Sequence, residues 1–255
     1  MVDIHTHILW GVDDGARSIE ESLDMLRMAA DCGTTDIVAT PHANSTYPFN
    51  LQVLNDRYHE LSSRHSGLPR MHRGCDFHLS AGNIQDALDH PTKYTINGGR
   101  HLMVELPEMF SPPAIENALA LLLAKGMVPV ITHPERNPVL QRSPEVLQSW
   151  IDRGCLGQVT AQSFSGRFGN RAKSSAWHFL RAGNIHFAAS DAHDTKHRPP
   201  RIDQAYDLLK EEIGEFAARS LVADNPQAVI ENRDDAIEIT LESPPRKWYQ
   251  RWSWR

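Results

Sequence analysis

Two histidines near the N-terminus carry the first chemical signal in this sequence. His5 and His7 stand in the apolar run 2–9, which indicates a buried strand. Alternation along a strand puts both imidazoles on one face, about 6–7 Å apart. Asp13 and Asp14 follow on a glycine-bounded loop, and imidazoles with carboxylates are ligands for divalent metals. Taken alone, this pattern fits a metal half-site or a buried histidine pair equally well.

Similar fragments recur at the ends of other strand-like runs. They supply His42 after 37–41, Asp76 and His78 after Gly74, Glu105 within 102–107, His133 and Arg136 after 128–132, and Asp191 and His193 after 185–190. A carboxylate in an apolar strand is costly unless it is paired or bound to a cation. The recurrence therefore indicates one site shared by several strand ends.

Helix-like segments alternate with these strands. Ser18 and Glu21 form a capping box that opens a helix to Ala30. Further helices are expected over 51–64, 115–124, 143–153, 171–182, 202–209 and 211–220. Alternating strands and helices predict parallel βαβ units. An open doubly wound sheet would bring only a few strand ends to one crevice, so the numerous contributing strands favour a β/α barrel with its site at the strand C-termini.

Composition narrows the class of protein. The length of 255 residues suits a single barrel domain. A net charge of −6 gives no basic field for nucleic acid. There is no secretory signal and no apolar run long enough to span a membrane, so the cytoplasm is the expected location. Cys32, Cys75 and Cys155 are too few and too widely spaced for a disulfide framework. None of them has an arginine six positions on, which excludes a cysteine-nucleophile phosphate loop.

The ordered set of these motifs resembles the PHP (polymerase and histidinol phosphatase) superfamily. The longer strings 3–7, 11–15, 133–136, 157–159 and 198–200 are similar to the bacterial PHP-type protein-tyrosine phosphatases of capsule and exopolysaccharide systems. The likeness runs from Met1 to about Asn232. It implies a PHP metallophosphatase domain over 1–232, followed by a C-terminal extension over 233–255.

The resemblance also implies a fold and a set of metal ligands. The fold is an α/β protein with a distorted (β/α)7-type barrel, and it holds up to three divalent ions. Mn²⁺ is expected, with iron, zinc or magnesium as alternatives. The three sites would be formed by His5, His7 and Asp191, by Glu105 and His133, and by Asp14, His42 and His193.

Asp76 departs from the family pattern. It stands where the family has a glutamate that bridges two metals, and aspartate is one methylene shorter. It could bridge only if its strand sits closer or the metals shift, and His78 is a substitute ligand. Asp13 is expected to fix the loop backbone, and Asp3 to make a structural hydrogen bond.

The implied activity is hydrolysis of phosphotyrosine by a metal-activated hydroxide, because clustered metals lower the pKa of a shared water. Arg136 and Arg198 would bind the phosphate through their planar forks. Surface roles, such as an ion pair between Arg136 and Glu135, are the alternative. The implied partner is a phosphotyrosine protein in capsule or exopolysaccharide synthesis, with a membrane-anchored tyrosine kinase as one candidate. A small-molecule phosphoesterase such as histidinol phosphatase, and a regulatory PHP module with an impaired metal site, stay open.

The C-terminal extension has its own composition. Residues 246–255 alternate basic and aromatic side chains, which suits peripheral contact with a membrane or with an acidic partner surface. Packing of this segment on its own domain is an equal alternative.

Overall fold

The computed structural model describes residues 1–67, 69–233 and 237. The basic and aromatic segment 246–255 therefore lies outside the described residues, and its predicted role stays a prediction. Within the described part, no helix is long and apolar enough to cross a membrane.

The strands of the described chain form two parallel sheets. The first has the order β1 (Val2–Thr6), β2 (Asp36–Ala39) and β4 (Arg70–Arg73). The second has the order β3 (His42–Ala43), β5 (Asp76–His78), β6 (His101–Glu105), β7 (Val128–Thr132), β8 (Leu156–Thr160) and β9 (Phe187–Ala189). All strand pairings are parallel, as the alternation of strands and helices predicts.

The two sheets join into one barrel. At Thr40 and Pro41 the chain passes from β2 into β3, and the two residues after Arg73 lead from β4 into β5. Because β3 continues β2 and β5 continues β4, the nine described strands occupy seven positions around the barrel. β9 closes the ring against β1, where the amide of His7 donates to the carbonyl of Ala192 at 2.8 Å and the amide of Asp191 donates to the carbonyl of His5 at 2.9 Å. The expected barrel class is confirmed.

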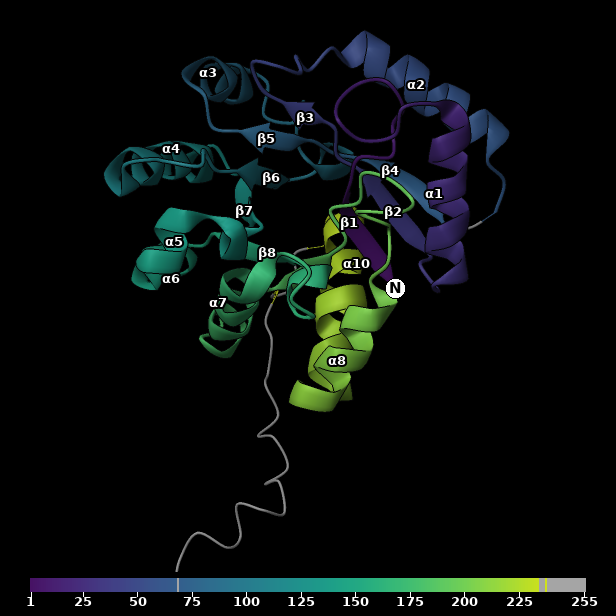
Figure 1. Ribbon diagram of the computed structural model, residues 1–255. Helices are drawn as coiled ribbons and strands as arrows, with labels where there is room; N and C mark the ends of the chain where they lie inside the picture. Colours follow the sequence, from purple (N-terminus) through teal and green to yellow (C-terminus); the bar gives the residue numbers. More distant parts are fainter. Residues whose placement is uncertain (68, 234–236, 238–255) are drawn as a thin grey trace, which may run out of the picture.

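Helices surround the strands on the outside (Figure 1). They are α1 (Ile19–Asp31), α2 (Leu51–Arg64), α3 (Ala81–Asp89), α4 (Pro112–Ala124), α5 (Pro138–Arg142), α6 (Pro144–Ile151), α7 (Gly169–Arg181), α8 (Asp203–Ile213), α9 (Glu215–Arg219) and α10 (Asn225–Ile230). The Ser18 hydroxyl caps α1 by accepting from the amide of Glu21 at 3.3 Å, as the sequence predicts. The prediction of a single helix over 143–153 is wrong at its end, because α6 stops at Ile151.

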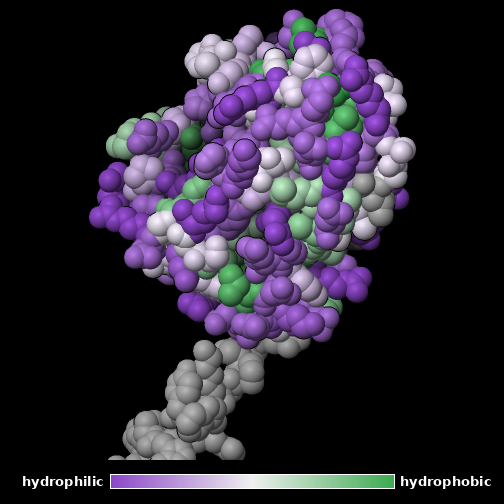
Figure 2. Space-filling model, turned by 45° about the vertical axis from the view of Figure 1, so that its right-hand side comes forward, coloured by the Kyte–Doolittle hydropathy of each residue, from purple (hydrophilic) through white to green (hydrophobic). Residues whose placement is uncertain are grey.

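Alternating side chains of a barrel strand lie on opposite faces, so those that pack against the helices are separated from those on the face that carries the site. In β6, Leu102 and Val104 pack in the cluster that joins the sheet to the helices, with Trp150 and Phe179. Met103 packs in a different cluster, so Glu105, two residues on, lies on the same face as Met103. The face seen in Figure 2 is mostly hydrophilic, with hydrophobic residues in small separate groups.

Candidate metal centre

The first predicted group of ligands meets where β1 and β9 end. The Nε2 atoms of His5 and His7 lie 3.6 and 3.5 Å from Oδ1 of Asp191. All three side chains are buried. The closure of the barrel between β1 and β9 brings them together, although Asp191 is far from both histidines in the sequence.

The loop after β1 supplies a second group. Oδ1 of Asp14 lies 3.3 Å from Nε2 of His42 and 3.5 Å from Nε2 of His193. With His7, these residues place one ligand atom each within 4.8 Å of one another. The loop can pass this close because Gly15 lacks a side chain: a Cβ there would lie 2.1 Å from the carbonyl oxygen of His7.

Asp76 reaches the centre despite its shorter side chain. Its Oδ2 lies 3.4 Å from Nε2 of His5 and 3.3 Å from Nδ1 of His42. It belongs to two groups of converging ligand atoms, one with His5 and His7 and one with His42 and Glu105. The reason is register, because Asp76 on β5 is paired with His42 on β3. The shorter aspartate therefore reaches both groups of ligand atoms.

Glu105 and His133 occupy the side of the centre next to Arg136. Both line a cavity of about 280 Å³ together with Arg136. Oε2 of Glu105 lies 3.4 Å from Nδ1 of His42, and His78 is farther, at 3.8 Å. The ring of His133 stacks on that of His5, with 5.7 Å between centroids. His133 lies outside the three groups of ligand atoms that meet within 4.8 Å among the described residues.

The histidines are oriented by hydrogen bonds at their second nitrogen. Nδ1 of His5 is 2.8 Å from Oε1 of Gln158, and Nδ1 of His7 is 2.8 Å from Oδ2 of Asp13. Nδ1 of His193 is 3.0 Å from the carbonyl of Asp191. Such bonds fix the ring and turn Nε2 toward a metal. Gln158 belongs to the string 157–159 that carries the family resemblance, but its role in orienting His5 was not predicted from the sequence.

Asp13 and Asp3 take the roles expected of them. Asp13 accepts from the amides of Gly15 at 3.0 Å and His42 at 3.1 Å, which fixes the loop over the site. Asp3 accepts from the amide of Ser190 at 3.0 Å, below the centre on β1.

Several polar atoms at the centre are buried without a hydrogen-bond partner among the described residues. They are Nε2 of His5, Nε2 of His7, Nδ1 of His42 and Oδ2 of Asp76. These atoms face one another, yet none has hydrogen-bond geometry. Burying such groups unsatisfied costs free energy, roughly 1–3 kcal/mol each. A divalent cation bound to imidazole nitrogens and carboxylate oxygens would satisfy them together, so the residues fit a metal centre.

Charge couples the carboxylates and imidazoles of the centre. Burial opposes ionisation of Asp76 and Asp191, but the neighbouring histidines hold the pKa of both carboxyls well below the ordinary value. Burial and the charge of Arg136 lower the pKa of His133 to about 4, whereas, against the effect of burial, the carboxylates raise the pKa of His7 to about 9 and that of His42 further. A cation that binds here would therefore displace protons from His7 and His42.

The backbone is strained at two of the predicted ligands. His133 has φ of 35° and Asp191 has φ of 53°, in the left-handed region that side-chain-bearing residues rarely adopt. Each such residue costs on the order of 1 kcal/mol or more and persists only where its surroundings enforce it. His133 directly follows β7, and Asp191 lies two residues beyond the end of β9.

Both predicted phosphate-binding arginines lie at the rim of this centre. Nη1 of Arg136 is 2.5 Å from Oδ2 of Asp191, and Arg198 donates to the same oxygen. Nε of Arg198 is buried and has no partner among the described residues. The alternative ion pair of Arg136 with Glu135 is wrong, since Glu135 is buried and accepts from Ser163 Oγ at 2.7 Å.

The turn that carries Arg198 is fastened by residues that sequence reasoning missed. Oδ1 of Asp194 accepts from the amides of Lys196 at 2.6 Å and of Arg198 at 3.3 Å. The guanidinium of Arg167, from the β8–α7 connection, donates to the carbonyl of His197 at 2.8 Å. Neither residue belongs to a recognisable motif, so only the tertiary structure reveals them.

The cysteines provide no alternative nucleophile. Cys75 and Cys155 are buried, and burial raises the pKa of Cys75 well above the ordinary value and that of Cys155 to about 12. Burial also raises the pKa of Cys32. Since the thiolate is the reactive form, none of the three thiols is activated at neutral pH.

Comparison with known proteins agrees with this geometry. Residues 1–231 match the family described as "Capsular polysaccharide synthesis, CpsB/CapC". The chain is 31% identical to the putative tyrosine-protein phosphatase CapC of Staphylococcus aureus, over 98% of this chain and 99% of that protein. It is 32% identical to the tyrosine-protein phosphatase YwqE of Bacillus subtilis, over 84% of this chain and 85% of that protein.

A solved structure of the same family has the same fold as this chain. It belongs to the pair YwqE from Bacillus subtilis and CpsB from Streptococcus pneumoniae, described as unique metal-dependent tyrosine phosphatases. It superposes with a TM-score of 0.87 at 29% identity, covering 97% of this chain and 100% of that chain. Dihydropyrimidinase from Brevibacillus agri, at 11% identity and a TM-score of 0.56, shares the fold alone.

Proposed function

The chain belongs to the CpsB/CapC family, and from that premise we propose that it is a metal-dependent protein-tyrosine phosphatase. The observation that carries the proposal is the set of buried, unpartnered imidazole and carboxylate atoms that converge at the strand ends. The named relatives are tyrosine-protein phosphatases that span nearly the same length. A regulatory module with an impaired site is disfavoured, because Asp76 lies within reach of two ligand groups.

The proposed cofactors are up to three divalent ions, with Mn²⁺ first and iron, zinc or magnesium as alternatives. Mixed nitrogen and oxygen donors suit these borderline and hard cations. The proposed ligands are His5, His7, Asp14, His42, Asp76, Glu105, His133, Asp191 and His193. When bound, the ions supply the Lewis acidity that makes hydroxide available near neutral pH and offsets phosphoryl charge.

The side chains of this chain bind and orient the phosphate ester. Arg136 and Arg198 both reach Oδ2 of Asp191 at the edge of the centre. A phosphate at this edge would meet two guanidinium groups, each able to donate in a planar fork. Nε of Arg198 is a buried donor free for this purpose among the described residues. The ring of Phe168 lies 4.6 Å from the Arg136 guanidinium and limits its freedom.

The proposed substrate is a phosphotyrosine protein that takes part in capsule or exopolysaccharide synthesis. A membrane-anchored tyrosine kinase fits this description, and contact with the membrane through residues 246–255 belongs to the proposal. We place the enzyme in the cytoplasm, which is consistent with the free thiols of Cys32, Cys75 and Cys155.

One preparation tests the activity. The protein is stripped with a chelator, its metal content is measured, and turnover is followed on phosphotyrosine peptides, phosphoserine peptides and histidinol phosphate. We expect turnover of the phosphotyrosine peptide to disappear with the metal and to return best with Mn²⁺. Full activity in the stripped protein would contradict metal dependence, and a preference for histidinol phosphate would contradict the substrate class.

A further inference from the structure

A second cavity lies outside the metal centre, against α2. It has a volume of about 620 Å³, more than twice that of the cavity beside Glu105. Its walls come from α2, from β4 and from residues 92–98. This volume is in the range of protein sites that bind small molecules or peptide side chains. None of its lining residues takes part in the proposed metal or phosphate site.

The lining combines apolar, neutral polar and cationic side chains. Leu51, Leu54 and Tyr58 of α2 form an apolar wall, and Arg73 and Lys93 contribute positive charge. Leu51 is 43% exposed. No aspartate or glutamate is among the described residues that line the cavity, although acidic residues outnumber basic ones in the chain. The lining therefore complements an acidic ligand that also carries apolar groups.

Arg73 is the cation available to such a ligand. Lys93 is already bound to Oδ2 of Asp86 at 2.6 Å. The guanidinium of Arg73 lies over the ring of Tyr58, 4.4 Å from its centroid, and faces Nε2 of His59 at 3.2 Å. No ion pair in the described part of the chain joins Arg73 to a carboxylate. Its charge is held in place by an aromatic ring and is not neutralised.

The cavity shares a loop with the metal centre. Tyr47 stacks on the ring of His42, with 5.9 Å between centroids and planes 13° apart. Phe49 lines the cavity and packs on Tyr94 at 4.8 Å. Two residues of extended chain span about 7 Å, so one short loop connects the two sites. A peptide whose phosphotyrosine enters the centre would reach the cavity with residues close to it in sequence.

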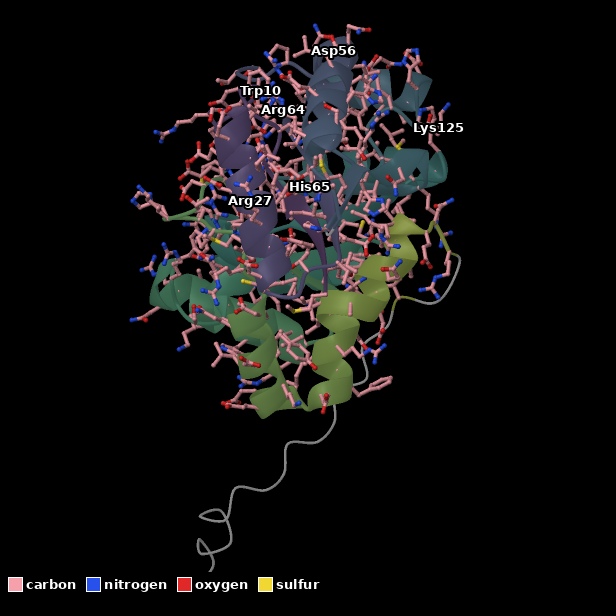
Figure 3. The ribbon with its side chains drawn as sticks, turned by 90° about the vertical axis from the view of Figure 1, so that its right-hand side faces the viewer. Trp10, Arg27, Asp56, Arg64, His65 and Lys125 are labelled. Atoms are coloured by element: carbon pink, nitrogen blue, oxygen red, sulfur yellow. The ribbon has the colours of Figure 1, made fainter. Side chains whose placement is uncertain are left out.

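We propose that this cavity is a docking site for an acidic segment with apolar side chains, located next to the phosphotyrosine of the substrate protein. The inference rests on the proposed phosphatase function and names the sequence context that the enzyme selects. A carboxylate of the segment pairs with Arg73, and an apolar side chain fills the wall formed by Leu51 and Leu54. Figure 3 shows α2 on the face that also carries α1, with Asp56 and Arg64 along it and Lys125 at a distance on the side of α4.

The test compares two phosphotyrosine peptides and one small substrate. The first peptide carries glutamate and leucine residues beside the phosphotyrosine, and the second carries glutamine in place of each glutamate. The small substrate is p-nitrophenyl phosphate, which cannot reach the cavity. We expect the wild-type protein to hydrolyse the acidic peptide with a higher kcat/KM than the glutamine peptide. Arg73→Glu should lower kcat/KM for the acidic peptide roughly tenfold, mainly through a higher KM. Turnover of p-nitrophenyl phosphate should not change.

Matched variants make the result decisive. Lys125→Glu makes the same change of charge away from the cavity and should leave the preference between peptides intact. Arg73→Gln and Leu51→Ser should each lose part of the preference, and both alter exposed side chains. An equal fall for both peptides, or the same fall in Lys125→Glu, would overturn the docking proposal.

A direct binding measurement separates this proposal from the proposed activity. The unphosphorylated acidic peptide is titrated by fluorescence anisotropy against the wild type and Arg73→Glu. Weaker binding to Arg73→Glu supports docking even if the protein hydrolyses no phosphotyrosine. Equal binding of the peptide to the two proteins, or binding to neither protein, would overturn docking and leave the phosphatase proposal untouched.

Discussion

Two parts of the metal centre differ in how their polar groups are satisfied. The floor is formed by the proposed ligands at the strand ends, and the rim is formed by Arg136 and Arg198. In the floor, ligand atoms of His5, His42 and Asp76 are buried and lack hydrogen-bond partners among the described residues. At the rim, Arg136 and Arg198 are ion-paired with Asp191, and the turn around Arg198 is fastened by its own hydrogen bonds. The floor therefore needs cations to satisfy it, whereas the rim is supported by the protein alone. Changes in the two regions should differ in what they do to bound metal.

The largest effect is expected in the floor. Asp76→Asn keeps the size of the side chain but removes the charge that faces His5 and His42. We expect metal stoichiometry to fall and kcat/KM to drop by about 1000-fold or more, as for the loss of several kcal/mol of charge stabilisation. His7→Ala should behave in the same way. Metal analysis and kinetics on the same preparation check this, and a fully loaded, active Asp76→Asn protein would exclude Asp76 as a ligand.

A smaller effect is expected at the rim. Arg136→Ala and Arg198→Ala should each cost about 2–4 kcal/mol of transition-state stabilisation, roughly 30- to 1000-fold in kcat/KM, by analogy with lost oxyanion donors. Replacement by lysine should recover only part, because a point charge does not reproduce the planar fork. Bound metal should stay near normal. If either alanine variant loses metal to the extent that Asp76→Asn does, the distinction between floor and rim is mistaken.

A still smaller effect is expected one layer behind the rim. Arg167 touches the turn of Arg198 through the carbonyl of His197 and is a positioning residue. Arg167→Ala should lower kcat/KM about 5-fold, the size of one modest hydrogen bond, and metal content should not change. The matched control is Arg171→Ala, an exposed arginine near the start of α7. In the double variant with Arg198→Ala, the effect of Arg167 should disappear. An effect that persists there would show that Arg167 acts by another route.

The sequence predicts the floor better than the support behind it. The proposed floor ligands other than Asp14 stand at or near strand ends in short local patterns, so the barrel and the convergence of these side chains follow from those patterns. The roles of Gln158 and Arg167 were not predicted, because each acts on a segment that only folding brings near. Asp194 was not predicted either, although the turn that it fastens is local. β4 was missed because its sequence, Arg70 to Arg73, has no apolar alternation, and α3 was missed because it is short. Arg198 is close to Asp191 in the sequence, whereas Arg136 meets Asp191 only because the strand order places β7 two strands from β9.

The smallest effect on metal content and kcat/KM is expected at a carboxylate away from the site. Asp36, at the start of β2, is 1% exposed and receives hydrogen bonds from Arg70 at 2.8 and 2.9 Å and from His72 at 2.8 Å. Here the protein supplies its own cations, so Asp36→Asn should leave metal content and kcat/KM unchanged.

The Asp36→Asn substitution should instead lower the free energy of unfolding. Burial opposes ionisation of Asp36, but the bonds from Arg70 and His72 lower its pKa below the ordinary value. The ionised carboxylate therefore stabilises the fold above the unfolded-state pKa, about 3.9. Its contribution is lost as the pH falls through the lower, folded-state pKa. Asp36→Asn should cost about 1–3 kcal/mol of unfolding free energy at pH 7, and less as the medium is acidified. Urea denaturation of both proteins at pH 7 and at about pH 3, below the unfolded-state pKa, measures this, and a difference that grows on acidification would show that the charge of Asp36 is not what stabilises β2.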